Sequence, residues 1–366
     1  MPFQINLPNS YQSQNAILKV IGVGGGGTNT INRMIAANIT DVEFWAVNTD
    51  AGVLKNSAAG NRLQIANDGL GVGGDPKKGE QCALENIEAL KDMISGADMV
   101  FITTGMGGGT GTGASPVIAK LAKEMGILTI AVVTKPFSFE QQIRMDYALE
   151  GIDKIKKYVD ALITIPNDRI FSVVDEKTPA PEMYRMVDDV LRLSIQTITD
   201  TITKTGIINI DFADVRAILK DSGDVIIGIG EDEDLTKAIS KAITNVFVEG
   251  PNIKNATSLL MNISYSNTNP LTTGDLVQFD KICKSEFKKC KSIKKGEIAE
   301  KDLDTRKKVS VIASFKEENN ISQYTGELFN DSEKEGNEQQ NEEEEQTFNF
   351  SVPACDQNWK LKYLKK

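Results

Sequence analysis

The sequence predicts an α/β protein in which a parallel, Rossmann-type sheet is joined to a smaller α/β unit. Three observations indicate this class: apolar strand runs alternate with helical stretches over residues 16–165, glycine clusters follow two of these runs, and a long apolar-periodic segment precedes further strands. Such alternation is typical of parallel strands covered by helices on both faces. With 366 residues, the chain has room for two domains and a tail.

The first domain is expected over residues 16–180, after an N-terminal extension of residues 1–15. Its strands are the six runs AILKVIGV, VEFWAVN, RLQIA, MVFITT, ILTIAVV and DALITIP. Helices are expected over residues 28–38 and 115–125, directly after the glycine clusters.

A long, largely buried helix is expected over residues 181–205, because apolar residues recur there at helical spacing. Such a helix would connect two domains. Residues 206–220 hold a polar loop and the helix that follows it. Residues 221–315 form the smaller α/β domain, with the strand runs VIIGIG, SLLMNIS and KVSVIAS and helices near 235–246 and 275–289.

The charge of the chain is concentrated in one segment. The formal net charge is −10, and residues 317–345 alone hold 11 acids and one lysine. Residues 316–346 are therefore expected to be a disordered acidic linker. Residues 347–366 regain aromatic and basic side chains, which is typical either of a docking peptide or of a frayed end.

Composition excludes several function classes. The chain has no histidine, which removes histidine-based catalysis and histidine metal sites. Its four cysteines form no C-x-x-C pair and are expected to be reduced thiols. The folded part is nearly balanced in charge, which argues against nucleic-acid binding. No run approaches the roughly 18 apolar residues of a membrane span, so we expect a cytoplasmic protein without direct membrane insertion.

The two glycine clusters are the strongest functional signal. The first, GVGGGG at residues 22–27, fits G-x-G-x-x-G and on its own is typical of a dinucleotide site, a mononucleotide site or a tight turn. The second, GGGTGTG at residues 107–113, adds hydroxyls suited to a polyphosphate. No P-loop lysine motif occurs, so backbone amides, a metal ion and an arginine would have to meet the phosphate charge.

Polar side chains follow other strands on the same rim. Glu140 and Arg144 are four residues apart, as in an ordinary helical ion pair, but they could also contact ribose and phosphate. Asn48, Thr49 and Asp50 could order a ribose or a magnesium-bound water, or simply cap a helix.

Two further polar groups lie on and after the long helix. Tyr184 and Asp188 share one helix face, where they are either surface residues or a stacking ring and an acceptor for guanine. In NIDFADVR, the residues Asn209, Asp211 and Asp214 cap a helix or activate a water. They lie about 30 Å from Asp188 at roughly 1.5 Å per residue, so they could reach only a nucleotide bound to a neighbouring chain.

Together these motifs resemble the FtsZ family, the tubulin-like GTPases of bacterial cell division. The resemblance covers residues 16–315 and rests on seven motifs that occur in this order along the chain: GVGGGGTN, VNTD, GLGVGGDP, GMGGGTGTGASP, VVTKPFSFEQQIR, NDR and NIDFADVR. It implies a tubulin-like fold that binds GTP or GDP, with Mg²⁺ held mainly by phosphates and water.

The resemblance also implies a role for each matching residue. The expected GTP-binding residues are Gly25, Gly26, Gly27, Thr28, Asn29, Asn48, Asp50, Gly73, Gly109, Thr110, Gly111, Glu140, Arg144, Asn167, Tyr184 and Asp188. Asp211 and Asp214, with Asn209, are expected to act in trans on the GTP of the adjoining subunit.

The implied function is assembly-dependent GTP hydrolysis in a head-to-tail homopolymer of the division ring. Residues 347–366 would bind division-ring proteins and membrane tethers, although Cys355 stands where family members commonly have phenylalanine. Two alternatives stay open: a nicotinamide-dependent dehydrogenase built on the first glycine cluster, and a tubulin-like regulator or cargo-positioning polymer without catalysis.

Overall fold

The structure is a computed structural model that describes residues 16–204, 206–244, 247–300 and 303–316. The expected N-terminal extension, the linker from residue 317 onward and the C-terminal peptide lie outside the described residues. The boundaries expected at residues 180, 205, 220 and 315 stay predictions.

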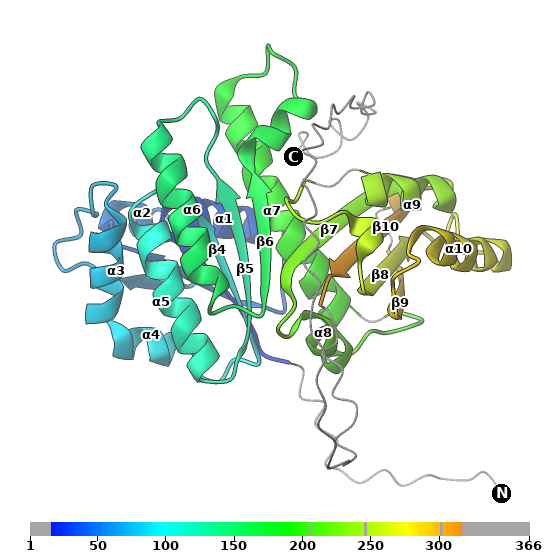
Figure 1. Ribbon diagram of the computed structural model, residues 1–366, viewed down its shortest axis with the longest axis horizontal. Helices are drawn as coiled ribbons and strands as arrows, with labels where there is room; N and C mark the ends of the chain where they lie inside the picture. Colours follow the sequence, from blue (N-terminus) through cyan, green and yellow to red (C-terminus); the bar gives the residue numbers. More distant parts are fainter. Residues whose placement is uncertain (1–15, 205, 245–246, 301–302, 317–366) are drawn as a thin grey trace, which may run out of the picture. The chain divides into compact units, whose positions relative to one another are not determined.

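A ten-stranded sheet runs through the described part of the chain, in the order β3-β2-β1-β4-β5-β6-β7-β10-β8-β9 (Figure 1). Neighbouring strands from β3 to β7 are parallel, as the alternation of strands and helices predicts. The strands are β1 Leu18–Val23, β2 Glu43–Asn48, β3 Asn61–Gln64, β4 Met99–Gly105, β5 Leu128–Lys135, β6 Ala161–Pro166, β7 Gly223–Asp232, β8 Ser258–Tyr265, β9 Ser292–Ala299 and β10 Lys307–Ser314.

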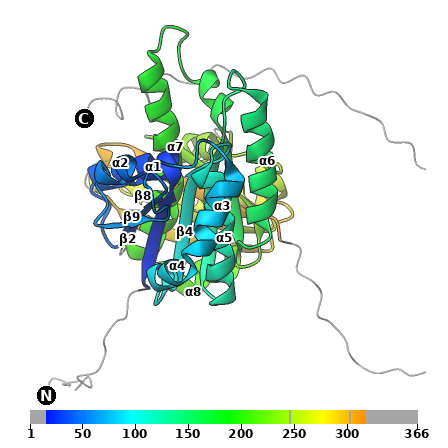
Figure 2. The ribbon, with the colours of Figure 1, turned by 90° about the vertical axis from the view of Figure 1, so that its left-hand side faces the viewer.

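Helices cover both faces of the parallel strands. In Figure 2, α1 and α7 lie on one side of the sheet and α3, α5 and α6 on the other. The helices are α1 Gly24–Ala36, α2 Ala51–Lys55, α3 Pro76–Glu85, α4 Ile87–Ile94, α5 Thr110–Glu124, α6 Gln142–Lys156, α7 Ala180–Thr203, α8 Phe212–Leu219, α9 Leu235–Thr244 and α10 Thr273–Glu286, with short 3-10 turns η1 Asn167–Ser172 and η2 Ile253–Asn255.

Each face of the sheet has its own apolar core. Alternate side chains of β1 point to opposite faces, as in any strand. Leu18 and Val20 belong to the core beneath α1 and α7, whereas Ile21 and Val23 belong to the core beneath α3 to α6. The two-sided burial explains why these strands are almost continuously apolar, and it confirms the predicted α/β class.

The second group of strands continues the same sheet. β7 is parallel to β6 over only two residue pairs, at Gly223 and Asp224, and is antiparallel to β10 from Val225 to Asp232. The long helix α7 spans 24 residues and therefore about 36 Å. In Figure 1, α8 lies at the lower end of the molecule, beyond the C-terminal end of α7. The expected central helix is thus confirmed.

Two helices begin earlier than expected. α1 starts at Gly24 rather than residue 28, and α5 starts at Thr110 rather than residue 115. The glycine clusters are therefore partly helical, because nothing forbids glycine from adopting helical dihedrals once the helix packs well.

One strand and one helix end escaped the sequence analysis. β9 carries two lysines and a glycine in SIKKGEIA, so it lacks the apolar signal of the other strands; it is an edge strand whose partner is β8. α10 spans Thr273–Glu286 instead of 275–289, since Thr272 and Asp275 form a capping box that fixes its start.

The glycines of α1 provide a matched test of this packing. A Cβ on Gly27 would lie 2.3 Å from the carbonyl oxygen of Thr103, whereas a Cβ on Gly25 would meet nothing within 4 Å. We expect Gly27→Ala to lower the free energy of unfolding by about 1–3 kcal/mol through overpacking. Gly25→Ala should leave it unchanged or raise it by up to about 1 kcal/mol, because alanine favours the helix. Urea unfolding without nucleotide measures both, and equal losses would contradict this packing.

Candidate nucleotide site

The two glycine clusters leave neighbouring strands at the point where the strand order reverses. β1 lies between β2 and β4, and Val23 is paired with Thr104 in parallel register. The next residues, Gly24 and Gly105, therefore start side by side at the carboxyl edge of the sheet. In open α/β sheets this switch point is where ligands bind.

The clusters touch each other through backbone atoms. A Cβ on Gly24 would lie 3.0 Å from the amide nitrogen of Gly111, and a Cβ on Gly26 would lie 3.0 Å from that of Gly105. Gly24 also has a φ of +70°, which disfavours other residues. Glycine is thus required for the N-termini of α1 and α5 to meet.

Both helix N-termini lack a side-chain cap. The N-cap residues are Val23 for α1 and Gly109 for α5, and neither accepts a hydrogen bond with its side chain. The hydroxyl of Thr28 points to a carbonyl instead, since Thr28 Oγ1 donates to Gly24 O at 2.8 Å. The unpaired first-turn amides and the two helix dipoles make this edge suited to an anion.

The predicted glycine-loop residues differ in access. Gly25 and Asn29 are exposed and Gly26 is half-buried, whereas Gly27, Thr28, Gly109, Thr110 and Gly111 are buried. Gly27 packs closely against Thr103 of β4. The hydroxyl of Thr28 is used in a hydrogen bond to the carbonyl oxygen of Gly24 within α1. Any contact of these two residues with a ligand would have to come from their backbone amides.

The segment of residues 69–76 packs against Gly109 of the second glycine cluster. Asp50 and Leu70 form a β-bridge, and a Cβ on Gly109 would lie 2.5 Å from Val72 Cγ2. Gly73 is exposed, has a φ of +59°, and would place a Cβ in open space. The structure therefore brings Gly73 to the same edge as the glycine clusters.

Asn48 closes a turn and Asp50 caps a helix in this structure. Asn48 Oδ1 accepts from the amides of Thr49 and Asp50, and Asp50 Oδ1 accepts from Val53 at the start of α2. Thr49 Oγ1 lies 2.6 Å from Thr110 Oγ1, which connects the end of β2 to the start of α5. Asp50 therefore caps α2, and the GTP-binding role expected of Asn48 and Asp50 stays a prediction.

Glu140 and Arg144 form the ion pair that their spacing predicts. Glu140 is mostly buried; its Oε1 accepts from the amide of Phe137 at 3.0 Å, and its Oε2 pairs with Arg144 Nη1. A Cβ on Gly107 would lie 2.5 Å from the carbonyl oxygen of Arg144, so the second glycine loop rests on the start of α6. The half-exposed guanidinium keeps further donors for an anion.

Asn167 lies at the end of β6, and Tyr184 lies near the start of α7. Asn167 begins η1 directly after β6, and its Oδ1 is buried without a hydrogen-bond donor among the described residues. Tyr184 meets Phe137 edge to face, with ring centroids 5.6 Å apart, and is half-exposed. Its free ring face suits stacking on a base.

Asp188 is the most perturbed acid of the site. Burial raises its pKa to about 7, Asp189 adds to the rise, and Arg33 of α1 counteracts it. A buried carboxylate of this kind favours a ligand that offers hydrogen-bond donors. Arg33, like Phe137, was missed by the sequence analysis, because only the packing of α1 against α7 brings it to Asp188.

The acid loop lies at the other end of α7. Asp211 Oδ1 caps α8 by accepting from the amide of Asp214 at 2.7 Å, and Asn209 Oδ1 accepts from Gly206. Asp214 Oδ1 also pairs with Lys294 Nζ of β9 at 2.8 Å. The pKa of Lys294 is raised by Asp214, with a smaller contribution from Asp211. Lys294 had no sequence signal, since β9 itself was not recognised.

β9 also anchors the acid loop through its backbone. Ile207 donates to Glu297 O at 2.9 Å, and Glu297 donates to Ile208 O at 2.9 Å. A Cβ on Gly206 would lie only 2.0 Å from Glu297 O. The acids are thus held rigidly and do not share the carboxyl edge of the sheet with the glycine clusters.

The described residues offer no ready-made metal site. No three cysteine, aspartate or glutamate side chains among them gather as metal ligands. The glycine clusters contain no carboxylate, so this edge fits a cation held by the phosphates and water. Within the same residues, no helix has the length and apolar character needed to cross a membrane.

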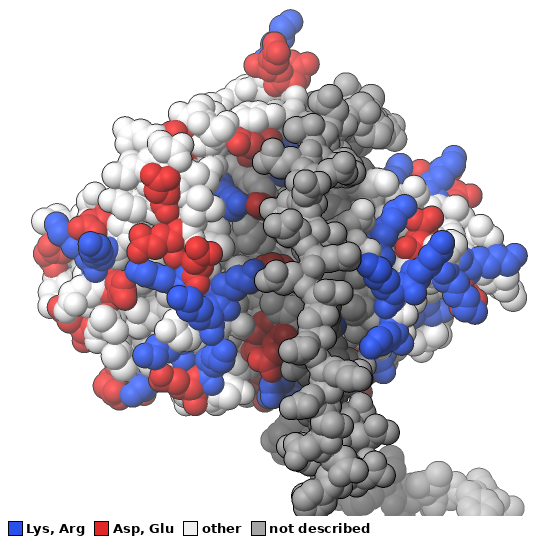
Figure 3. Space-filling view, in the orientation of Figure 1, with Lys and Arg blue, Asp and Glu red and all other residues white. Residues whose placement is uncertain are grey.

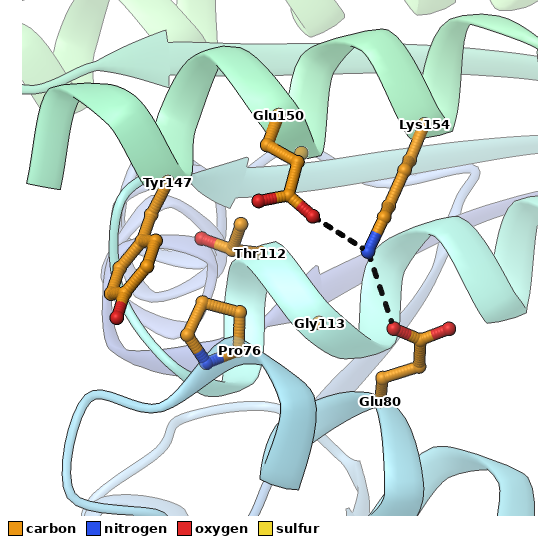
Figure 4. A pocket seen from close by; sticks show the side chains of 8 residues that line it. Pro76, Glu80, Thr112, Gly113, Tyr147, Glu150 and Lys154 are labelled. Atoms are coloured by element: carbon orange, nitrogen blue, oxygen red, sulfur yellow. Dashed lines mark hydrogen bonds and ion pairs between the residues drawn. The ribbon is translucent and has the colours of Figure 1, made fainter. Parts of the chain in front are cut away.

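A depression between α3, α5 and α6 adjoins the second glycine cluster, because Thr112 and Gly113 line it (Figure 4). Lys154 Nζ lies 3.1 Å from Glu150 and 3.4 Å from Glu80 there. A Cβ on Gly113 would lie 2.1 Å from Pro76 O. The glycines at this place serve close helix packing, and the two carboxylates disfavour an anion.

Comparison with known proteins agrees with this geometry. The GTPase-domain model of the Tubulin/FtsZ family matches residues 17–175. An empty FtsZ dimer from M. jannaschii is 36% identical, with a TM-score of 0.76 over 83% of this chain and 89% of that one. CetZ2 from Haloferax volcanii, solved as a GTPgS-bound protofilament, is 17% identical, with a TM-score of 0.69 over 81% and 92% of the two chains. The latter likeness shows the fold alone.

Asp188 predicts a pH dependence of nucleotide affinity. Its folded pKa lies far above that of the unfolded chain, so the stability that it contributes is present at low pH and is lost as the pH rises through about 7. The hydrogen-bond donors of a guanine base should favour the ionised form of the Asp188 carboxyl group. We therefore expect GDP affinity to rise by up to about tenfold between pH 6 and pH 8.

Calorimetric titration of wild type and Asp188→Asn measures this dependence. The variant should bind more weakly at pH 8, and its affinity should change with pH only as far as the phosphates titrate. The assignment is wrong if both proteins show the same pH profile.

Proposed function

We propose that this chain, which belongs to the Tubulin/FtsZ family of GTPases, assembles head to tail into filaments in which each GTP lies between two subunits. The separation of the two halves of the site carries the proposal. The glycine clusters lie at the carboxyl edge of the sheet, and the acid loop lies beyond the far end of a helix of about 36 Å. Asp211 and Asp214 can therefore reach only the GTP of the next subunit.

Exposed apolar side chains at both ends support this stacking. Beside the glycine clusters, Leu70 is 83% and Phe139 61% exposed; beside the acid loop, Ile207 is 75% exposed. Ile208 and Ile293 add to the second end. Burying such side chains against a second copy would stabilise the contact by about 25 cal/mol per Å² of apolar surface.

The proposed division of roles follows the geometry. The first-turn amides of α1 and α5, with Gly73, hold the phosphates; Glu140 and Asn167 face the ribose, Arg144 lies by the phosphates, and Tyr184 and Asp188 hold guanine. Asn48 and Asp50 shape the edge of the pocket through their caps. Mg²⁺, held by phosphates and water, would supply charge neutralisation. Most of the rate would come from positioning and electrostatic stabilisation.

The acid loop would position the attacking water in trans. Two carboxylates directed at a triphosphate would repel it, and Lys294 offsets part of this charge through its ion pair with Asp214. Asn209 holds the loop closed by accepting from Gly206. Stacking of subunits thereby completes each site and couples hydrolysis to assembly.

We assign residues 16–180 to GTP binding, 181–205 to the central helix, 206–220 to the catalytic loop and its helix, and 221–315 to the smaller domain. The 36% identity to an FtsZ over most of both chains supports a role in the cytoplasmic division ring. Residues 347–366 would bind membrane tethers and other ring proteins, with residues 316–346 as the acidic linker.

Mixing two inactive variants tests catalysis between chains. Asp214→Asn should lower GTP turnover at least about 100-fold while keeping the nucleotide site. Gly25→Trp should block the phosphate edge without a clash, since nothing lies within 4 Å of its Cβ direction. An equal mixture should recover up to about a quarter of the wild-type rate, because one interface in four joins an intact site to an intact loop.

The matched control is the double variant Gly25→Trp/Asp214→Asn mixed with Asp214→Asn. This mixture contains no intact acid loop and should stay inactive. If the first mixture is as inactive as the control although both variants fold and co-assemble, catalysis in trans is wrong.

A further inference from the structure

Lys294 gives the acid loop a basic side chain as its neighbour. It lies on the edge strand β9, and its Nζ is 2.8 Å from Asp214 Oδ1. Two residues along the strand, Gly296 points to the same face as Lys294. A Cβ on Gly296 would lie 3.0 Å from Ile210 Cδ1, so Ile210 packs against this face of β9. The missing side chain of Gly296 thus allows the acid loop to lie beside Lys294.

The ion pair leaves the ammonium group of Lys294 available to a further partner. The side chain of Lys294 is 45% exposed, whereas that of Asp214 is 29% exposed. Among the residues that the structure describes, Lys294 forms no ion pair other than that with Asp214. An ammonium group has three N–H donors, so Lys294 keeps donors for a ligand. Since Asp214 raises the pKa of Lys294, the group stays charged at neutral pH.

The glycine clusters lack the cation that a triphosphate needs. Residues 22–27 and 105–113 contain no basic residue, and the chain has no P-loop lysine motif. Arg144 lies at this edge, but its guanidinium is paired with Glu140. In phosphoryl transfer, negative charge on the γ-phosphoryl group must be neutralised, and in some GTPases a second molecule supplies a basic side chain for this purpose. The divided site therefore has a place for a cation from the adjoining subunit.

The surface around β9 has the sign of charge that such a contact needs. Figure 3 shows basic side chains gathered over the part of the molecule that carries α9, α10 and β9 in Figure 1. Within the described part of the chain, Lys281, Lys288 and Lys289 of this surface form no ion pair. Their positive potential would attract a subunit end that carries a triphosphate. Lys294 is the lysine that the acid loop holds.

We propose that Lys294 crosses the subunit contact and binds the γ-phosphate of the adjoining subunit's GTP. The inference rests on the proposed function, because it requires the acid loop to face that nucleotide. A water held by Asp214 attacks the γ-phosphorus from about 3–3.5 Å. Lys294 Nζ is 2.8 Å from the same carboxylate, so it lies beside the attacked phosphoryl group. Asp214 orients both the water and the lysine.

The proposed contact changes no covalent bond of the lysine. The water oxygen bonds to the γ-phosphorus, the bond to the bridging oxygen breaks, and its electron pair leaves on GDP. One proton of the water is released to solvent, and Lys294 stays protonated throughout. Its charge stabilises the negative charge on the γ-phosphoryl oxygens in the transition state.

Turnover per assembled chain tests this role. Lys294→Met removes the charge and should lower GTP turnover at least about tenfold. Lys294→Arg keeps a cationic donor and should stay within about threefold of wild type. The matched control is Lys288→Met, at an exposed lysine, which should leave turnover unchanged. GTP affinity of the unassembled subunit should be the same in all variants, because Lys294 belongs to the other half of the site. Wild-type turnover in Lys294→Met would overturn the inference.

The threshold concentration for assembly separates a phosphate contact from mere support of Asp214. It is measured with a non-hydrolysable GTP analogue that keeps the γ-phosphate. In the Asp214→Asn background, adding Lys294→Met should still raise the threshold at least about threefold, because an attraction to the phosphate is lost. An unchanged threshold in that background would show that Lys294 acts only through Asp214, and the inference would be wrong.

Mixed filaments test whether Lys294 acts on the neighbour's GTP. An equal mixture of Lys294→Met and Gly25→Trp should recover up to about a quarter of the wild-type rate, as one contact in four has both halves intact. Lys294→Met mixed with Asp214→Asn has no such contact and should stay below about a tenth.

The mixtures also distinguish this inference from the proposed function. If Lys294→Met and Gly25→Trp do not complement each other although Asp214→Asn and Gly25→Trp do, Lys294 does not act in trans. If neither pair complements, catalysis between chains is itself wrong, and the role of Lys294 falls with it.

Discussion

The backbone contact between the N-termini of α1 and α5 is the constraint on which the rest of the molecule depends. A side chain on Gly24 or Gly26 would meet backbone nitrogen at 3.0 Å, so the contact exists only because both clusters are glycine. It places two sets of unpaired amides at adjoining strand ends, with neither helix capped by a side chain. Each helix then contributes its dipole to the same small volume, which is how a site without a P-loop lysine meets polyphosphate charge.

The glycine clusters themselves contain no carboxylate that could activate a water molecule. The acids that could do so are fixed elsewhere. β9 holds their loop through a pair of backbone hydrogen bonds between Glu297 and the residues Ile207 and Ile208. α7 then keeps loop and nucleotide apart by its own rigid length. In the proposed function, the acid loop therefore acts on the nucleotide of a second subunit.

Much of this was predictable from the sequence, because the responsible signals are local. Parallel strands buried on both faces read as apolar runs, and the glycine clusters mark the strand ends that meet at the switch point. The helix starts were misplaced because glycine is a weak helix former that tertiary packing overrode here. The pairing of Glu140 with Arg144 and the cap at Asp211 follow from spacing alone.

What the sequence could not provide depends on contacts between distant segments. Arg33 opposes the raised pKa of Asp188 only because α1 packs on α7. Lys294 pairs with Asp214 from the edge strand β9. The lysines of β9 interrupt the apolar pattern by which a strand is recognised in a sequence.

The rate of GTP hydrolysis per chain, measured against protein concentration with light scattering in parallel, tests the divided site most directly. We expect almost no turnover below a threshold concentration and a steep rise in turnover at the concentration where scattering begins. A rate per chain that is the same at all concentrations, including those without assembly, would contradict it, because a single subunit would then hold a complete active site.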